Sequence, residues 1–287
     1  MSSLFRSVSK PQGGVSELPD QSPDSQDLAD ELNCRATQSS RTGRLIVNAD
    51  DWGRDQYTTD RIKDCSLHGS VSSVSAMVFM EDSERAATLA LEHGIDTGLH
   101  LNFTTRFSAK GCPGRLVEHQ QRVAEYLLRH RINQVIFHPG LSHSFEYVVA
   151  AQVEEFCRLS GRAPNRVDGH HHMHLSANVL LQGLLPRGII VRRNFSFQPG
   201  EKSFANRSYR KTVDFWLGRR HRLTDFLFSI TPLEAQGRLR RILWLAQQSF
   251  VELETHPVNA DEYRFLIEGG LAGLAPGLLV ASCFSVR

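Results

Sequence analysis

Two adjacent carboxylates raise the first chemical question in this sequence. Asp50 and Asp51 follow the apolar run Leu45–Val47, at the point where a buried strand would end. Two like charges side by side are costly unless a group of opposite charge lies against them. A divalent cation would use both, because one Asp can ligate the ion while the other stays ionised and accepts a proton from a water beside it.

Chemically capable side chains also accompany four other apolar runs. They are His100 in TGLHLNF, Asp168 and the run from His170 to His174 in RVDGHHHMH, Arg192 and Arg193 in GIIVRRNF, and Glu254 and His256 in FVELETH. In parallel barrels, catalytic residues gather at the C-terminal ends of the strands. One Asp and two His from separate strands make a three-ligand site with positions open for water and substrate. The pattern therefore predicts a divalent-metal site at one rim.

Each of these signals has a simpler interpretation when it is taken alone. An Asp pair can be a helix N-cap beside a solvated neighbour, and a lone His such as His100 is often a hydrogen-bonded core residue. The HHHMH run could be a metal-binding surface tract or a chance cluster. Their coincidence at the ends of several predicted strands favours the metal site.

The elements that must carry these residues alternate along the chain. Predicted strands cover 45–48, 71–79, 97–103, 166–174, 188–195, 250–256 and 278–284. Predicted helices cover 58–68, 82–93, 117–130, 145–160, 177–186, 238–248 and 261–270. Such alternation indicates βα units and a parallel sheet. Six or seven units in 287 residues favour an α/β TIM-like barrel, complete or incomplete, over an open sheet.

Composition sets further limits on the function. The formal net charge of +2 gives no push toward nucleic acid, and no apolar run is long enough for a transmembrane segment. The five cysteines are scattered and never spaced as CxxC. With no secretory signal at the start of the chain, this usage fits a reducing, cytoplasmic location. Residues 1–43 hold too few large apolar side chains to build a core, so we expect a disordered extension there and a folded domain over 44–287.

The motifs resemble those of the YdjC-like carbohydrate deacetylases, a family that includes chitooligosaccharide deacetylase and the hopanoid-biosynthesis-associated deacetylases. The resembling segments are NADDWG (48–53), HGSVSSVSAMV (68–78), GLHLNFT (98–104), NRVDGHHHMHL (165–175), GIIVRR (188–193) and ELETHP (252–257). The resemblance covers roughly residues 44–287. It implies a deformed (β/α) barrel and the metal-dependent hydrolysis of an N-acetyl group on an amino sugar or oligosaccharide, with release of acetate.

The resemblance also implies a role for six residues, carried over motif by motif. Asp51, His100 and His170 would hold one divalent ion. Mg²⁺ is the metal that the family suggests, whereas nitrogen-rich ligation also suits Zn²⁺ or another transition metal. The catalytic roles would fall to Asp50 as general base, His256 as general acid, and Arg192 as the residue that orients Asp50 or the substrate.

The sequence departs from the family pattern in two places that matter for the site. Trp52 replaces the usual Phe after the Asp pair, which is a tolerable aromatic exchange. Residues 105–145 differ from the family's usual form and contain a second His-Pro dipeptide, His138-Pro139. His138 is therefore a competitor for the acid role of His256.

Two other functions stay open, and so does the oligomeric state. A metal-dependent phosphoesterase on a similar barrel would want more ligands, which His171, His172 and His174 could supply. A non-catalytic carbohydrate- or metal-binding relative would have no need of an intact set of catalytic residues. The sequence leaves a homodimer open.

A basic segment between Arg192 and Arg241 holds twelve Lys and Arg residues against four acids, with Phe204, Tyr209, Phe215 and Trp216 among them. A solvated, Arg-rich loop and helix face is the simpler interpretation. Because the segment starts at the predicted functional rim, it could also cover the substrate. Aromatic faces suit sugar rings, and the positive charge would favour an anionic N-acetylated sugar.

The composition of the first 43 residues leads to a stability prediction. A chain that starts at Thr42 should fold and melt like the full chain, because the missing residues cannot bury a core. Thermal unfolding followed by circular dichroism measures this. A shortened chain that fails to fold, or melts far lower, would show that the extension contributes to the domain.

Overall fold

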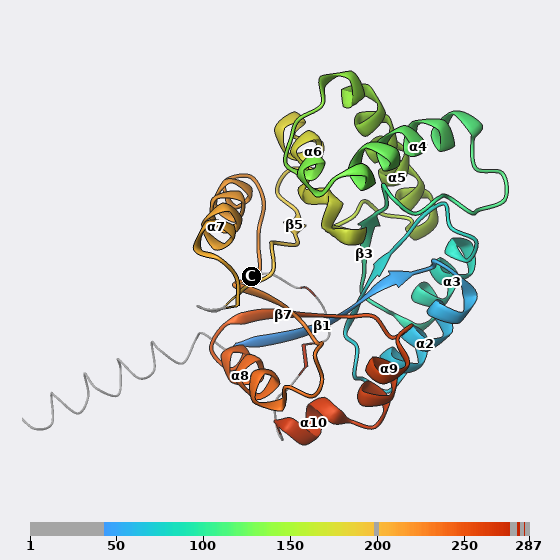
Figure 1. The fold of residues 1–287 in the computed structure, drawn as a ribbon. Helices are drawn as coiled ribbons and strands as arrows, with labels where there is room; N and C mark the ends of the chain where they lie inside the picture. Colours follow the sequence, from blue (N-terminus) through green and yellow to red (C-terminus); the bar gives the residue numbers. More distant parts are fainter. Residues whose placement is uncertain (1–42, 198–200, 276–279, 282–283, 285–287) are drawn as a thin grey trace, which may run out of the picture. The chain divides into compact units, whose positions relative to one another are not determined.

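The structure is a computed structural model that describes residues 43–197, 201–275, 280, 281 and 284. Within this part, seven parallel strands form one sheet in the order β5-β4-β3-β2-β1-β7-β6 (Figure 1). The strands are β1 (Arg44–Trp52), β2 (Ser73–Ala76), β3 (Thr97–Leu101), β4 (Arg166–Gly169), β5 (Ile190–Val191), β6 (Phe226–Ser229) and β7 (Phe250–Thr255). The predicted extension over 1–43 lies outside the described residues, apart from Gly43.

The strand order is that of a barrel opened between β5 and β6. The two edge segments still meet, because Ile190 and Arg222 form a parallel bridge and the Val191 N–H donates to the Arg222 carbonyl at 3.0 Å. Farther along, the Ser196 N–H donates to the Leu227 carbonyl at 2.8 Å. The chain is thus an α/β protein with a curled parallel sheet, which fits a deformed TIM-like barrel.

Helices connect the strands and bury the outer face of the sheet (Figure 1). They are α2 (Gln56–Leu67), α3 (Ser83–His93), α4 (Gly114–Arg129), α5 (Ser142–Ser160), α6 (Ala177–Gln182), α7 (Phe204–Gly218), α8 (Gln236–Ala246), α9 (Ala260–Ile267) and α10 (Gly270–Leu274), with 3-10 turns η1 (Arg131–Gln134), η2 (Pro139–Leu141) and η3 (His170–Leu175). Gly94 and Gly161 end α3 and α5 at φ of 64° and 69°, where a side chain would be strained. No helix in the described part of the chain is long and apolar enough to cross a bilayer.

Alternate residues of the strands divide the sheet into an apolar and a polar face. On β1, Leu45, Val47 and Ala49 belong to the main apolar core, whereas Asn48 and Asp50, which alternate with Val47 and Ala49, are buried away from it. The other strands repeat this pattern, with these buried polar residues on the inner face: Ser73, Ser75, His100, Arg166, Asp168, Arg192, Glu252 and Glu254. The period of two in a strand therefore places these polar and charged side chains on the inner face, where Ile46, Ile190 and Phe284 form a small second apolar cluster.

Two predicted strands need correction, and two elements of the fold were not predicted. The predicted strand 166–174 ends at Gly169, and the histidine run forms η3 instead. The predicted strand 188–195 shrinks to Ile190–Val191. Helix α7 and strand β6 were not predicted, so the strand that carries Glu254 is the seventh rather than the sixth. Most of the strand predicted over 278–284 lies outside the described residues, although Val280 bridges to Leu45.

The missed elements share a physical cause. Helix α7 fully buries only Asp214 and Leu217, with Val213 and Trp216 partly buried against the core, so its apolar stripe is short and stands among many basic residues. Strand β6 has four residues and follows a charged segment, which leaves little signal. Both elements depend on the rest of the fold more than on their own sequence.

Candidate active site

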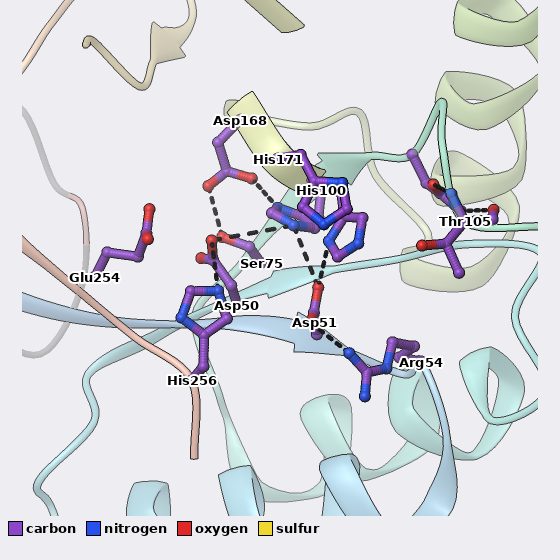
Figure 2. A network of polar contacts seen from close by, with 12 residues as sticks. Asp50, Asp51, Arg54, Ser75, His100, Thr105, Asp168, His171, Glu254 and His256 are labelled. Atoms are coloured by element: carbon purple, nitrogen blue, oxygen red, sulfur yellow. Dashed lines mark hydrogen bonds and ion pairs between the residues drawn. The ribbon is translucent and has the colours of Figure 1, made fainter. Parts of the chain in front are cut away.

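Three side chains from separate elements meet at the carboxyl end of the sheet, and Figure 2 shows two of them, Asp51 and His100. Asp51 comes from β1, His100 from β3 and His170 from the start of η3, and one ligand atom of each lies within 4.8 Å of the others. The Asp51 Oδ1 atom is 3.5 Å from His100 Nε2 and 2.9 Å from His170 Nδ1. The structure thus brings together the set expected to hold a metal.

A bulge in β1 explains how two consecutive residues can both reach this site. Neighbours on a regular strand point to opposite faces. The pairing of β1 with β2 shifts between Ala49 and Trp52, and Asp51 has a φ of 71°. A bulge of this kind re-aims a side chain, and a positive φ outside glycine costs of order 1–3 kcal/mol. The strained backbone therefore turns Asp51 toward the histidines while Asp50 stays on the inner face.

His100 is oriented by a carboxylate behind it. Its Nδ1 lies 2.7 Å from Asp168 Oδ1, so Nδ1 carries the proton and Nε2 points toward Asp51. Although burial opposes protonation of the ring, the charges of Asp50 and Asp168 raise the pKa of His100 to about 10. The surroundings thus favour a positive charge on Nε2, and a metal cation would supply one.

The unsatisfied atoms of the cluster support a metal ion as well. Asp51 Oδ1 and His100 Nε2 are both buried and lack a partner with hydrogen-bond geometry, whereas buried polar atoms are normally satisfied. Ligands about 2.1 Å from one ion lie about 3.0–3.4 Å from one another, and the two measured separations are close to this. The residues present therefore fit a divalent ion with one oxygen and two nitrogen ligands.

Arg54 holds the second oxygen of Asp51. Its Nη1 lies 2.9 Å from Asp51 Oδ2, which leaves Oδ1 to face the histidines. Burial pushes the pKa of Asp51 upward, but contacts with His100 and His170 hold it well below its usual range. Asp51 is therefore ionised, as a metal ligand must be.

Arg192 is the centre of a buried charge network. It donates to Asp50 through both terminal nitrogens, at 2.6 and 2.7 Å, and to Glu252 at 2.7 Å. Asp168 and Glu254 lie 3.2 and 3.1 Å from the same guanidinium. Burial opposes the charge, but these four carboxylates hold the pKa of Arg192 well above its usual range. Arg192 thus holds the Asp50 carboxylate through two hydrogen bonds and offsets the negative charges of the inner face.

The remaining contacts of Asp50 select one of its oxygens for chemistry. Asn48 Nδ2 donates to Oδ1 at 2.9 Å, and Arg192 takes a second site on that atom. Oδ2 accepts from Arg192 only and lies 3.9 Å from His256 Nε2. Oδ2 also lies 4.0 Å from His100 Nε2, and its second lone pair has no hydrogen-bond donor among the described residues.

His256 differs from its neighbours in being a third exposed, whereas Asp50 is 4% exposed. It follows β7, and its backbone N–H donates to Glu262 Oε2 at 2.7 Å. Glu254 forms a cluster with Asp50 and His256, with one polar atom of each within 4.8 Å of the others. His256 thus borders both the buried carboxylates and solvent.

His138, His171, His172 and His174 are not members of these clusters, although His171 packs against His170 with ring centroids 4.0 Å apart. His138 is exposed, and its ring packs against Tyr126 with ring centroids 4.8 Å apart. The buried His174 contacts the Arg192 carbonyl through Nε2, and burial lowers the pKa of His174 to about 3. His172 Nε2 lies 3.2 Å from Glu254, and His171 Nδ1 lies 3.1 Å from Thr104 Oγ1. Among the described residues, none of the four joins a group that could hold a metal.

Residues 44–268 match the family described as YdjC-like protein. The chain belongs to the YdjC-like family. Within this group, the chitooligosaccharide deacetylase of Enterobacter sp. (strain 638) is 30% identical over 224 residues, which cover 76% of this chain and 82% of that protein.

Mouse and human proteins named carbohydrate deacetylase are each 34% identical over 145 residues. These matches cover 47% of this YdjC-like chain but only 44% and 42% of the mouse and human proteins, so the chain spans less than half the length of either. A solved structure from Enterococcus faecalis V583, named for cellobiose-phosphate cleavage, has a TM-score of 0.59 at 18% identity and covers 84% of this chain and 97% of its own. At that identity the likeness supports the fold alone.

Proposed function

We propose that this YdjC-like protein is a metal-dependent carbohydrate N-deacetylase, which hydrolyses the acetamide of an amino sugar to acetate and a free amine. The observation that carries the proposal is the placement of Asp50 and His256 beside the cluster of Asp51, His100 and His170. The names of the relatives, carbohydrate deacetylase and chitooligosaccharide deacetylase, support the same reaction.

Asp51, His100 and His170 would hold the ion. When bound, a divalent metal polarises the acetyl carbonyl and lowers the pKa of water. Two nitrogens and one oxygen suit Zn²⁺ or another transition metal, while Mg²⁺ is the ion that the family resemblance suggests. The other residues of the site would then move protons and hold the substrate.

Asp50 would act as the general base. It receives a proton from the attacking water on Oδ2, the oxygen with a free lone pair. Arg192 fixes the carboxylate plane through two hydrogen bonds, so the base is positioned before the substrate arrives. The water oxygen then bonds to the acetyl carbon.

His256 would act as the general acid. Its Nε2 faces the Asp50 carboxylate, and its partial exposure leaves it reachable by a substrate. It donates a proton to the sugar nitrogen as the carbon–nitrogen bond breaks, which gives a neutral amine as leaving group. His138 lies in an exposed turn beside Tyr126 and joins none of the groups that Asp50, Asp51 and His256 form, which favours His256 for this role.

An acetate-release screen with added metals tests the proposal. The full chain should release acetate from N-acetylated mono- or oligosaccharides, and its metal content should approach one ion per chain, because the described residues hold one cluster of the Asp-His-His type. Phosphate release from sugar phosphates at a comparable rate, with two or more metals per chain, would favour a phosphoesterase. Metal binding without any turnover would favour a non-catalytic relative.

A cavity of about 490 Å³ beside α7 suggests which sugars would bind. Four phenylalanines line it, Phe195, Phe197, Phe204 and Phe226, together with the cations Arg207, Arg210 and Lys211. Asp214, an acid in its wall, is already paired with Arg193 at 2.9 Å. Arg207 and Lys211 have no ion-pair partner in the described part of the chain. We infer that the cavity favours an anionic ligand.

The cavity adjoins the reactive residues. The ring of Phe195 packs against His172, with ring centroids 4.6 Å apart, and His172 contacts Glu254. Trp216 lies elsewhere, in a separate hollow against α6 with Leu180 and Gly183. The aromatic side chains that would contact a sugar ring in this cavity are therefore the phenylalanines and not Trp216.

A charge variant tests this preference. Arg207→Gln should raise KM for an anionic acetamido sugar by about fivefold and leave KM for a neutral one unchanged, because only the charged ligand uses the cation. The preference should weaken as salt rises. Arg219→Gln, an exposed position just after α7, is the matched control. Equal KM shifts for neutral and anionic sugars would remove the electrostatic basis of the idea.

A further inference from the structure

An exposed apolar patch lies between α4 and α5, away from the cavity beside α7. It consists of Leu128, Ile132, Val135, Ile136 and Phe137, whose side chains are 39–59% exposed. Helix α4 buries a single stripe, formed by Leu116, Gln120, Val123 and Leu127. Leu128 follows that stripe by one residue and so faces outward. Five large apolar side chains within ten residues form an apolar patch, and such patches mark interaction sites.

The backbone beneath the apolar patch is fixed by hydrogen bonds. The Tyr126 hydroxyl donates to the Ile136 carbonyl at 2.9 Å, and Asn133 Nδ2 donates to the Tyr126 carbonyl at 2.6 Å. Asn178 of α6 exchanges two hydrogen bonds with the backbone of His138, at 2.9 and 3.0 Å. These hydrogen bonds fix the backbone that carries the exposed apolar side chains. Helix α6, which takes part in them, directly follows the turn that carries His170.

Positive charges border the apolar patch. Arg122, Arg129 and Arg131 are exposed, and none has an ion-pair partner among the described residues. The one acid between residues 121 and 138 is Glu125, whose carboxylate accepts a hydrogen bond from Gln121. The local surface thus combines exposed apolar side chains with arginines that outnumber the acids.

We propose that the apolar patch and its arginines dock this protein on an anionic lipid surface. Peripheral membrane segments use this combination, in which apolar side chains enter the head-group boundary and cations bind anionic lipids. A symmetric contact with a second copy fits less well, because it would bring two equally positive surfaces together, with Glu125 as the one acid between residues 121 and 138 to offset them. An acidic protein fits less well too, since the patch has no Trp or Tyr of the kind that anchors protein interfaces.

Vesicle sedimentation of the full chain tests the proposal. The protein should bind vesicles of phosphatidylcholine with about 30% phosphatidylserine, bind phosphatidylcholine alone much more weakly, and lose the difference in high salt. Arg129→Gln with Arg131→Gln should weaken binding about 25-fold, at about fivefold per charge. The matched control, Arg219→Gln with Arg240→Gln, removes two exposed cations elsewhere and should bind like the unchanged chain.

A second set of variants tests the apolar side chains of the patch. Ile132→Ser with Ile136→Ser should weaken vesicle binding at least about tenfold, whereas Leu67→Ser, at an exposed position on α2, should not. Thermal unfolding checks that each variant is folded. Equal binding to neutral and anionic vesicles, or unchanged binding by the serine variants, would overturn the proposal. So would a dimer in sedimentation analysis that the serine variants abolish, because the patch would then serve a second copy.

Discussion

An Asp50→Asn protein should release acetate at least about 100-fold more slowly than the unchanged chain, within the range expected for loss of a positioned general base. The amide keeps the shape of the carboxylate but cannot take up the proton on Oδ2. The metal set should be unaffected, because Asp50 is not one of its three members. Initial rates at saturating substrate, measured on metal-loaded protein, give the comparison.

Further measurements on the Asp50→Asn protein distinguish loss of the general base from disturbance of the ion pairs around Arg192. Asn at position 50 removes one of the carboxylates around Arg192, but Asp168, Glu252 and Glu254 remain within 3.2 Å of it. Unfolding temperature and metal content therefore need to be measured beside the rate. Asp60→Asn, at an ion pair with Arg85 away from the cluster, makes the same chemical change as a control and should keep full activity. Near-normal turnover in metal-loaded Asp50→Asn protein would assign the base to another residue.

The sequence pattern predicted which residues lie at the carboxyl end of the sheet, because the pattern that marks a strand and its end is local in the sequence. Apolar runs locate strands, and residues that end parallel strands meet at one edge of the sheet. Asp51, His100 and His170 therefore came together as expected, although His170 does so from a 3-10 turn and not from a strand. The bulge in β1 could not be predicted from the sequence pattern, because a period of two assigns the consecutive residues Asp50 and Asp51 to opposite faces of the strand.

The inner face of the sheet could not be predicted in the same way. In FVELET, alternation marks a strand with one apolar face, and the polar face of such a strand normally meets water. Glu252 and Glu254 are instead buried, because the curled sheet turns that face toward Arg192. Asp168 was visible as a strand residue, but its contact with His100 depends on the pairing of β3 with β4, which brings His100 beside Asp168.

A His170→Ala protein should lose its metal while the fold survives. His170 supplies one of the three ligand atoms, and it lies at the first residue of η3, so its ring is not part of the apolar core. The affinity should fall by more than the roughly 10–100-fold that loss of a partner behind a ligand costs. Elemental analysis after dialysis, together with calorimetric titration of the chosen metal, measures this without relying on turnover.

Two comparisons make the His170 result specific. His172→Ala removes a neighbouring histidine that contacts Glu254 instead of the metal set, and it should retain the ion. Asp168→Asn keeps all three ligands but weakens the hold on His100 Nδ1, so its affinity should fall between those of His170→Ala and the unchanged chain. If His170→Ala retains its metal and Asp168→Asn behaves like the unchanged chain, the ion must bind elsewhere. Asp50, Glu254 and His256, which also form a group that could hold a metal, would then be the next set to test.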